Sequence, residues 1–200
     1  MAGTANGGPV WLEGTFRFPG LAPEGEVSLT GRAIAMALPP GVRTEIDTDL
    51  LLQVDPEDAV LSGTVSLVRG DYREPINATG GLLTLLESRP PPAVVGDEPS
   101  WLDGLRLDLR VLTVEDVVVS NNYGVGTLGA DTRLGGTVAR PAVTGRATVG
   151  DGGQVFLGGN TFEIESATVD FIDPDGIVPE IDATARTRVG QEEITITFEG

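Results

Sequence analysis

Few residues in this sequence combine the type and the spacing that chemistry requires. Glu163 and Glu165 could in principle form the carboxylate pair of a glycoside hydrolase. They lie two positions apart beside a turn, however, so they share one face of a strand, and nothing cleft-like can be recognised around them. We therefore interpret these two glutamates as strand residues and expect no catalytic role for them.

Two acidic turns resemble parts of cation-binding loops. Asp173 and Asp175 stand in an Asp-Pro-Asp-Gly turn, but the third ligand and the closing glutamate of a helical calcium loop are missing. The Asp-Gly-Gly run at 151–153 does not continue into a calcium-binding nonapeptide repeat. We predict ordinary turns at both places and no metal ion.

Two further motifs match known signals by spacing alone. The run Gly124–Gly129 has the glycine spacing of the dinucleotide fingerprint, but that fingerprint needs a helix after the glycines, and more strand follows here. The run Asn77–Thr79 fits the acceptor of N-glycosylation, which matters only in a secreted eukaryotic protein. The glycines are interpreted as strand or turn residues, and no cofactor is expected.

Composition excludes most of the remaining enzyme classes. The 200-residue chain contains no cysteine or histidine, and all 13 of its basic side chains are arginine. Thiolate nucleophiles, Ser-His-Asp triads, most transition-metal sites, lysine-containing phosphate loops and Schiff bases are therefore excluded. With 30 acidic side chains the net charge is −17, which repels nucleic-acid phosphates. We expect neither an enzyme nor a nucleic-acid-binding protein.

The elements that position any site in this chain are strands. Apolar and polar residues alternate with a period of two in stretches along most of the sequence, as they do in strands with one apolar face. The 28 glycines and 14 prolines punctuate these stretches, and helical periodicity is nearly absent. The pattern predicts an all-β chain of about a dozen short strands.

The middle of the chain departs from the alternating pattern. Residues 81–89 carry leucines that could form about two helical turns. The prolines from Pro90 to Pro99 indicate a loop or linker, because proline cannot join a central strand. We therefore divide the chain into N-terminal strands (1–77), a short helix and proline-rich insertion (78–104, with its core near 78–100) and C-terminal strands (105–200).

The pattern leaves two architectures open. Two sheets could close their apolar faces on each other in a sandwich, whereas a curled open sheet would leave an apolar trough that is itself a binding surface. No leader segment is visible, and no apolar run approaches the ~20 residues of a membrane helix. Because the sequence stops directly after a strand-like run, we expect a piece of a longer chain. Ile194–Phe198 would then be an unprotected edge that pairs with another chain.

An ordered succession of motifs runs along the C-terminal half of the chain, with one more upstream. The segments are Gly136–Gly145, Gly153–Ile164, Ala167–Phe171, Pro179–Ala185, Glu193–Gly200 and, upstream, Leu61–Tyr72. They follow the order G-T-x-x-x-P-x-x-x-G, G-x-[IV]-x-x-x-G-x-x-F-x-I, [IV]-x-F, P-x-[IL]-[DN]-x-x-A and a final alternating strand, with L-x-G-x-[IV]-x-[IVL]-x-R-G-x-Y upstream. This succession resembles one family, the C-terminal domain of TamB, within the wider AsmA-like group, and the resemblance covers roughly 43–77 and 105–200.

The resemblance implies an elongated, taco-like curled sheet with an apolar concave groove. It implies a place in the periplasm of a diderm bacterium, with the full-length protein anchored in the inner membrane by a region outside this sequence. The implied function is to carry phospholipid between the inner and outer membranes, with acyl chains in the groove, in support of outer-membrane biogenesis. The alternative is chaperone-like assembly of outer-membrane barrel proteins or autotransporters by β-strand addition, with a partner barrel of the TamA or BamA kind. A structural or adhesive sheet without a ligand is the third possibility.

The apolar side chains of the alternating stretches are the candidate lining of this implied groove. Each lies in phase with its apolar neighbours along a predicted strand. The predicted lining consists of Ile46, Leu50, Leu52, Leu61, Val65, Leu67, Leu107, Leu109, Val111, Val143, Val149, Val169, Phe171, Ile181, Ala183, Ile194, Ile196 and Phe198.

Overall fold

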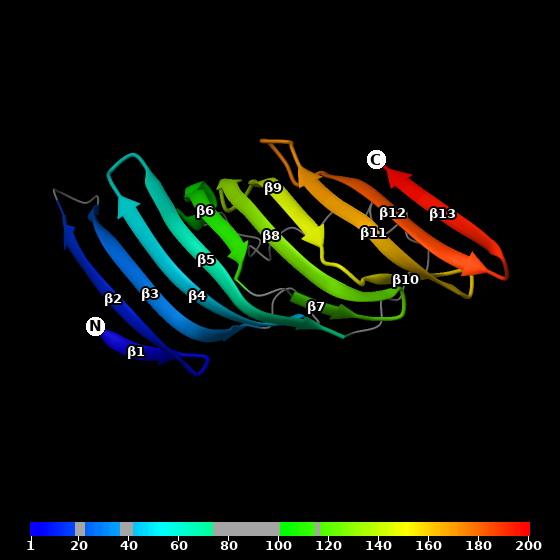
Figure 1. Cartoon of the computed structure of the whole chain (residues 1–200). Coiled ribbons are helices and arrows are strands. Elements are labelled where there is room, and N and C mark those ends of the chain that lie inside the picture. Colours follow the sequence, from blue (N-terminus) through cyan, green and yellow to red (C-terminus); the bar gives the residue numbers. More distant parts are fainter. Residues whose placement is uncertain (19–22, 37–41, 74–100, 115–116) are drawn as a thin grey trace.

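The computed structural model describes residues 1–18, 23–36, 42–73, 101–114 and 117–200. These residues form one curled sheet of 13 strands. The only helical element among them is a single 3-10 turn, η1 (Trp101–Gly104). Figure 1 shows the strands side by side from β1, near the N-terminus, to β13 at the C-terminus. The prediction of an all-β chain is confirmed, and of the two architectures left open the described chain forms the single curled sheet.

Turns connect most strands directly to the next strand along the chain. The strands are β1 (Ala2–Ala5), β2 (Gly8–Arg17), β3 (Glu24–Met36), β4 (Val42–Val54), β5 (Ala59–Tyr72), β6 (Arg106–Thr113), β7 (Val117–Ser120), β8 (Gly124–Gly136), β9 (Pro141–Val149), β10 (Gln154–Leu157), β11 (Asn160–Phe171), β12 (Pro179–Val189) and β13 (Glu192–Glu199).

The sheet is an antiparallel meander with one parallel junction. Strands β1 to β5 pair in chain order, and β5 then pairs in parallel with β6 and β7. Both β6 and β7 lie between β5 and β8, and both β9 and β10 lie between β8 and β11. Strands β12 and β13 complete the sheet, so its two edges are β1 and β13.

Several strands are longer than the sequence pattern predicted. Strands β3, β4 and β8 have 13 residues each and β5 has 14, whereas strands in globular proteins usually have about 5–6. The prediction of short strands was therefore wrong for this part of the sheet. A bulge in β3 and another in β5 shift the alternation of apolar and polar residues partway along the strand. In the sequence alone, each of these long strands therefore looks like two shorter ones.

The helix predicted for residues 81–89 and the proline-rich segment lie outside the described residues. The strands on either side of the insertion are direct neighbours, because Val60 to Leu67 of β5 lie opposite Arg106 to Thr113 of β6. The only described remnant of residues 78–104 is η1, and a backbone hydrogen bond from the N–H of Leu105 to the carbonyl of Leu102 at 3.0 Å leads from it toward β6.

Glycines let side chains of neighbouring strands close over the backbone. A Cβ on Gly70 of β5 would lie 2.7 Å from Cγ2 of Val117 and 2.8 Å from its Cγ1. A Cβ on Gly153 would lie 3.0 Å from Cγ1 of Val149 and 3.2 Å from Cδ1 of Ile164. Such distances leave no room for a methyl group, so these glycines are part of the packing between strands.

We predict that Gly70→Ala destabilises the sheet by about 1–3 kcal/mol, because the new methyl group forces Val117 out of its position. Urea unfolding measures the loss. In the double variant with Val117→Ala, the cost should fall below the sum of the two single costs, since the smaller side chain makes room. Gly3→Ala is the control, because nothing lies within 4 Å of a Cβ there. Strictly additive losses would contradict the packing account.

Candidate functional site

The pairing of neighbouring strands places their apolar side chains on one side of the sheet. Residues directly opposite each other in adjacent strands point to the same side. Leu52 of β4 lies opposite Leu61 of β5, and Leu61 lies opposite Leu107 of β6. Because side chains alternate along each strand, these pairs determine the side on which the other residues lie. We call this side of the sheet the apolar face.

The apolar face continues into the C-terminal strands. Leu109 of β6 lies opposite Leu134 of β8, which lies opposite Val143 of β9. Strand β9 pairs with β11, where Val169 lies opposite Ile181 of β12. Strand β12 then pairs with β13 in an unbroken register. Toward the N-terminal edge, Leu50 of β4 lies opposite Leu29 of β3, which lies opposite Leu12 of β2. A single surface of mainly aliphatic and aromatic side chains therefore extends from β2 to β13.

Every residue of the predicted groove lining lies on the apolar face. The pairing brings them together as one surface, although they are distributed over seven strands of the sequence. They are Ile46, Leu50 and Leu52 of β4, Leu61, Val65 and Leu67 of β5, Leu107, Leu109 and Val111 of β6, Val143 and Val149 of β9, Val169 and Phe171 of β11, Ile181 and Ala183 of β12, and Ile194, Ile196 and Phe198 of β13. Their contact with a lipid stays a prediction.

Sequence reasoning missed the contribution of β3 to this surface. Val27 and Leu29 lie opposite Leu52 and Leu50 of β4, but the register shifts between Gly31 and Ile34. Beyond the shift the apolar positions of β3 are even-numbered, so no unbroken alternation spans the strand. Only its first half carries a signal that a search for period-two patterns could have found.

The apolar face is more buried in its central strands than at its two ends. Ile46, Leu109 and Val117 are 8%, 7% and 8% exposed. In contrast, Phe16 of β2 is 45% exposed and Phe198 of β13 is 44% exposed. A continuous apolar surface that stays accessible at large aromatic side chains is typical of a binding surface.

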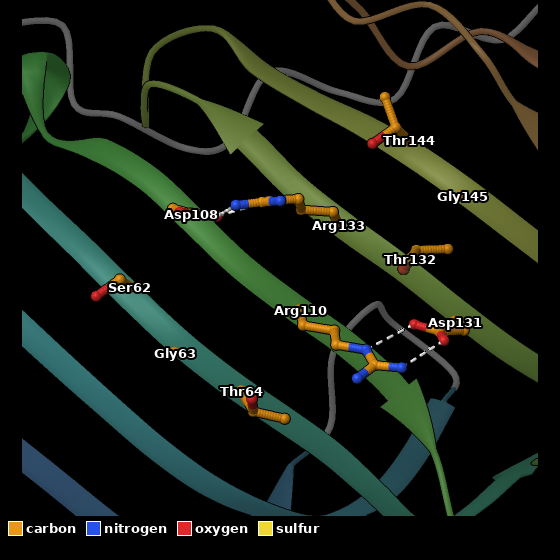
Figure 2. A pocket seen from close by; sticks show the side chains of 10 residues that line it. All are labelled: Ser62, Gly63, Thr64, Asp108, Arg110, Asp131, Thr132, Arg133, Thr144 and Gly145. Carbon is orange, nitrogen blue, oxygen red and sulfur yellow. Dashed lines mark hydrogen bonds and ion pairs between the residues drawn. The ribbon is translucent and has the colours of Figure 1, made fainter.

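The opposite side of the sheet, which we call the polar face, carries arginine–aspartate pairs. Arg110 donates from Nε and Nη2 to the two carboxylate oxygens of Asp131 at 2.9 and 2.6 Å, and Nε of Arg133 donates to Asp108 at 2.7 Å. Figure 2 shows both pairs between β6 and β8, around a depression of about 640 Å³ that Ser62 also lines. Because each guanidinium in the depression already faces a carboxylate, the charges there are balanced within the chain.

The arginines of the polar face shift the pKa values of their partners. Arg146 donates from Nε and Nη2 to Asp170 at 2.6 and 2.9 Å. The hydrogen bonds from Arg110 and Arg146 lower the pKa of Asp131 and Asp170 below the ordinary aspartate value. The positive charge of each arginine lowers the pKa further, and partial desolvation opposes the effect. The same hydrogen bonds raise the pKa of both arginines.

The residues that the sequence suggested for chemistry have structural partners. Oδ1 of Asp173 accepts the backbone N–H of Asp175 at 2.9 Å, which closes a turn. Glu165 forms an ion pair with Arg186 at 2.9 Å. The run that begins at Gly124 lies within β8 and continues as strand. Among the described residues, no group of three or more His, Cys, Asp or Glu side chains is placed to hold a metal ion.

Comparison with known proteins identifies one family. The family model described as the TamB C-terminal domain matches residues 1–199. No curated protein matches the sequence. Within the described ranges, no helix has the length and apolar character needed to cross a membrane.

We predict that acid weakens the sheet through the polar-face aspartates. Because the pKa of Asp131 and of Asp170 is lowered by folding, the stabilisation from their ion pairs is present above the unfolded value of about 3.9. It is lost as the pH falls through the lower folded value. Unfolding measured between about pH 5 and pH 2 should therefore show a smaller acid-induced loss in the Asp131→Asn/Asp170→Asn variant than in the unmodified chain.

Asp151→Asn provides the control for this prediction, since it removes one charge from an exposed turn. It should leave the acid-induced loss unchanged. An equal loss in the unmodified chain and in the double variant would show that the two ion pairs play no part in acid stability.

Proposed function

The chain belongs to the TamB family, and from this premise we propose that its apolar face carries phospholipid acyl chains between the inner and outer membranes. Family membership gives the chain a TamB-like role in outer-membrane biogenesis, within a translocation and assembly module that has membrane partners. The observation that carries the proposal is the continuity of the apolar face from β2 to β13. A path for acyl chains needs such a surface and needs no catalytic group.

The chemistry of the apolar face suits a hydrocarbon ligand. Its side chains are mostly aliphatic or aromatic, with a few threonines such as Thr44 and Thr48, and burial of each methylene of an acyl chain contributes about 0.8 kcal/mol. The arginines and aspartates lie on the polar face, where they keep the outside of the sheet hydrated. An acyl chain on the apolar face would therefore meet a hydrocarbon-like environment along the whole sheet.

The proposed setting is the periplasm of a diderm bacterium. The full-length protein would be anchored in the inner membrane by a segment outside this sequence, and an outer-membrane barrel of the TamA or BamA kind would receive what it delivers. This setting agrees with a sheet that has one hydrated face and one apolar face. The proposal assigns no enzymatic step to the chain.

A second candidate function, assembly of barrel proteins by strand addition, is favoured by the edge of β13. Strand β13 pairs with β12 alone in the described chain. Ile181 and Gly200 exchange two backbone hydrogen bonds. Because hydrogen-bonded and non-hydrogen-bonded pairs alternate in an antiparallel ladder, Thr195 and Thr197 direct their backbone N–H groups away from β12. This edge can accept a strand from another chain.

We predict that lipid contacts one face of the sheet only. A photo-crosslinking residue would be placed in cells at Ile181 and Ile196 on the apolar face, and at the adjacent Asp182 and Thr195 on the polar face. Lipid adducts, identified by mass spectrometry, should form at the first two positions and not at the last two. Each neighbour is a matched control, because it shares the same strand and depth in the sheet.

Ile181→Arg adds a second test of the same path. The guanidinium would sit in the route of the acyl chains at a desolvation cost of several kcal/mol, so transport should stop while the open sheet stays folded. Equal adducts on both faces, or adducts on neither, would overturn the proposal of an apolar path.

For the edge of β13 we predict self-association that proline abolishes. Light scattering should show dimers or larger species of the 200-residue chain at high concentration. Thr195→Pro/Thr197→Pro should restore monomers without weakening the fold, because both N–H groups point outward. Ile196→Pro should instead unfold the edge, since that N–H points toward β12. A strictly monomeric unmodified chain would argue against an adhesive edge.

A further inference from the structure

The strands of this sheet are interrupted at particular points. Strand β3 has a register shift between Gly31 and Ile34, and β5 has one where it passes Glu45 and Ile46 of β4. Strand β11 has a third shift at Glu165. In addition, the line of β6 breaks before β7 begins, and the line of β9 breaks before β10 begins. Figure 1 shows β7 beyond the end of β6 and β10 beyond the end of β9.

These interruptions lie side by side. The shifts of β3 and β5 both flank residues 45–48 of β4. Leu67, next to the shift of β5, lies opposite Thr113, the last residue of β6. The break between β6 and β7 faces residues 129–130 of β8. The break between β9 and β10 faces residues 126–127 of β8 on one side and residues 164–167 of β11 on the other. Together they form one line across the strands from β3 to β11, which we call the crease.

Several of the most buried side chains on the apolar face lie along the crease. Thr44, Ile46 and Thr48 of β4 are 9%, 8% and 5% exposed, Val117 at the start of β7 is 8% exposed, and Ala185 opposite the shift of β11 is 3% exposed. Leu105 and Leu109 are buried to a similar degree away from the crease, at 7% each. Because side chains crowd together where a surface bends inward, and because the bulges that bend the strands lie on the same line, we infer that the sheet bends toward its apolar face there.

On the polar face, the two bulged strands at the ends of the crease are each held by an ion pair. Arg32, in the bulge of β3, pairs with Asp49 of β4 at 3.1 Å and donates from Nη1 to the carbonyl of Thr48 at 3.1 Å. The next residue, Ala33, has a φ of 51°, a backbone angle that residues with a Cβ rarely adopt. Its N–H donates to Oδ1 of Asp47 at 2.8 Å. Arg32 also forms a longer ion pair of 3.9 Å with Asp47, so β4 holds the bulge through four contacts.

The bulge of β11 has a corresponding contact. Glu165 is the extra residue between Ile164 and Ser166, and its carboxylate pairs with Nη1 of Arg186 on β12 at 2.9 Å. A bulge bends and twists the strand that contains it. A contact that holds a bulge in place therefore also holds the bend.

We propose that Arg32 and Asp47, at one end of the crease, and Glu165, at the other, are positioning residues. They set the bend angle of the sheet, which is the angle between the parts of the strands on the two sides of the crease. The bend is a property of the chain alone. That this angle sets the width of the space open to acyl chains rests on the proposed function.

The angle can be measured between spin labels on one continuous strand. The chain contains no cysteine, so Arg43→Cys and Gln53→Cys would label the exposed polar face of β4 on both sides of the crease. In a straight strand, positions this far apart are separated by about 33 Å. Because these labels lie on the outer side of the bend, the bend spreads them apart, and pulsed electron–electron double resonance should give a distance longer than the straight value when Arg32 and Asp47 are intact. With Arg32→Gln or Asp47→Ala, the distance should shorten toward the straight value.

Arg106→Gln is the matched control, since it breaks an ion pair of 2.6 Å with Asp58 away from the crease. It should leave the distance unchanged. Circular dichroism would show that each variant is folded. An unchanged distance in Arg32→Gln and Asp47→Ala, or an equal shortening in Arg106→Gln, would overturn the proposal.

Glu165→Gln tests the other end of the crease independently of Arg32. Labels at Glu180→Cys and Arg188→Cys on the polar face of β12 would be separated by about 26 Å in a straight strand. The bend spreads them apart, so this distance should shorten in Glu165→Gln. All distances are measured without lipid. A shortened distance combined with no lipid adduct at Ile181 would therefore support the crease and reject the lipid path, whereas unchanged distances with adducts would do the reverse.

Discussion

The period of two in a pleated strand is the constraint on which this structure depends. A sheet with a single layer has no second layer to cover its apolar side chains, so most of them lie on one side, and Trp11 and Val118 are exceptions on the polar face. A slip of one residue in any pairing would turn a whole strand over. The pairings Leu52–Leu61, Leu61–Leu107 and Leu109–Leu134 show the register kept across antiparallel and parallel junctions alike. One continuous apolar face is the result.

The polar face helps to hold this register. Arg110 and Arg133 lie directly opposite each other on β6 and β8. By themselves, two positive charges in this position would repel each other. Each arginine instead reaches a carboxylate on the neighbouring strand, Asp131 and Asp108, so the four charges balance only in this register. An exposed pair contributes little free energy. Its geometric requirement, repeated between several strands, disfavours slipped pairings in a chain with a net charge of −17.

Bulges reconcile long strands with a curled sheet. Strands of 13 residues, such as β3 and β4, must bend to enclose an apolar surface, and a regular ladder resists bending. The extra residues of β3, β5 and β11 and the breaks before β7 and β10 concentrate the bend on one line. Glycines at the same level, Gly70 among them, leave room for the side chains that crowd there. The positions along the crease therefore give the sheet both its curvature and its tight packing.

The sequence by itself determined the strands and the side that each presents, because alternation is local: β4, β6 and β12 can be read directly from their residues. In the structure, the apolar residues that this local pattern singled out in these strands share one side of the sheet. Only the tertiary structure decided the rest. The phase of β3 after Arg32, the parallel pairing of β5 with β6, and the choice of a single curled sheet over a sandwich all depend on contacts between distant residues. A period of two shows which way a side chain points relative to its own strand, and only the pairing of strands decides what it faces.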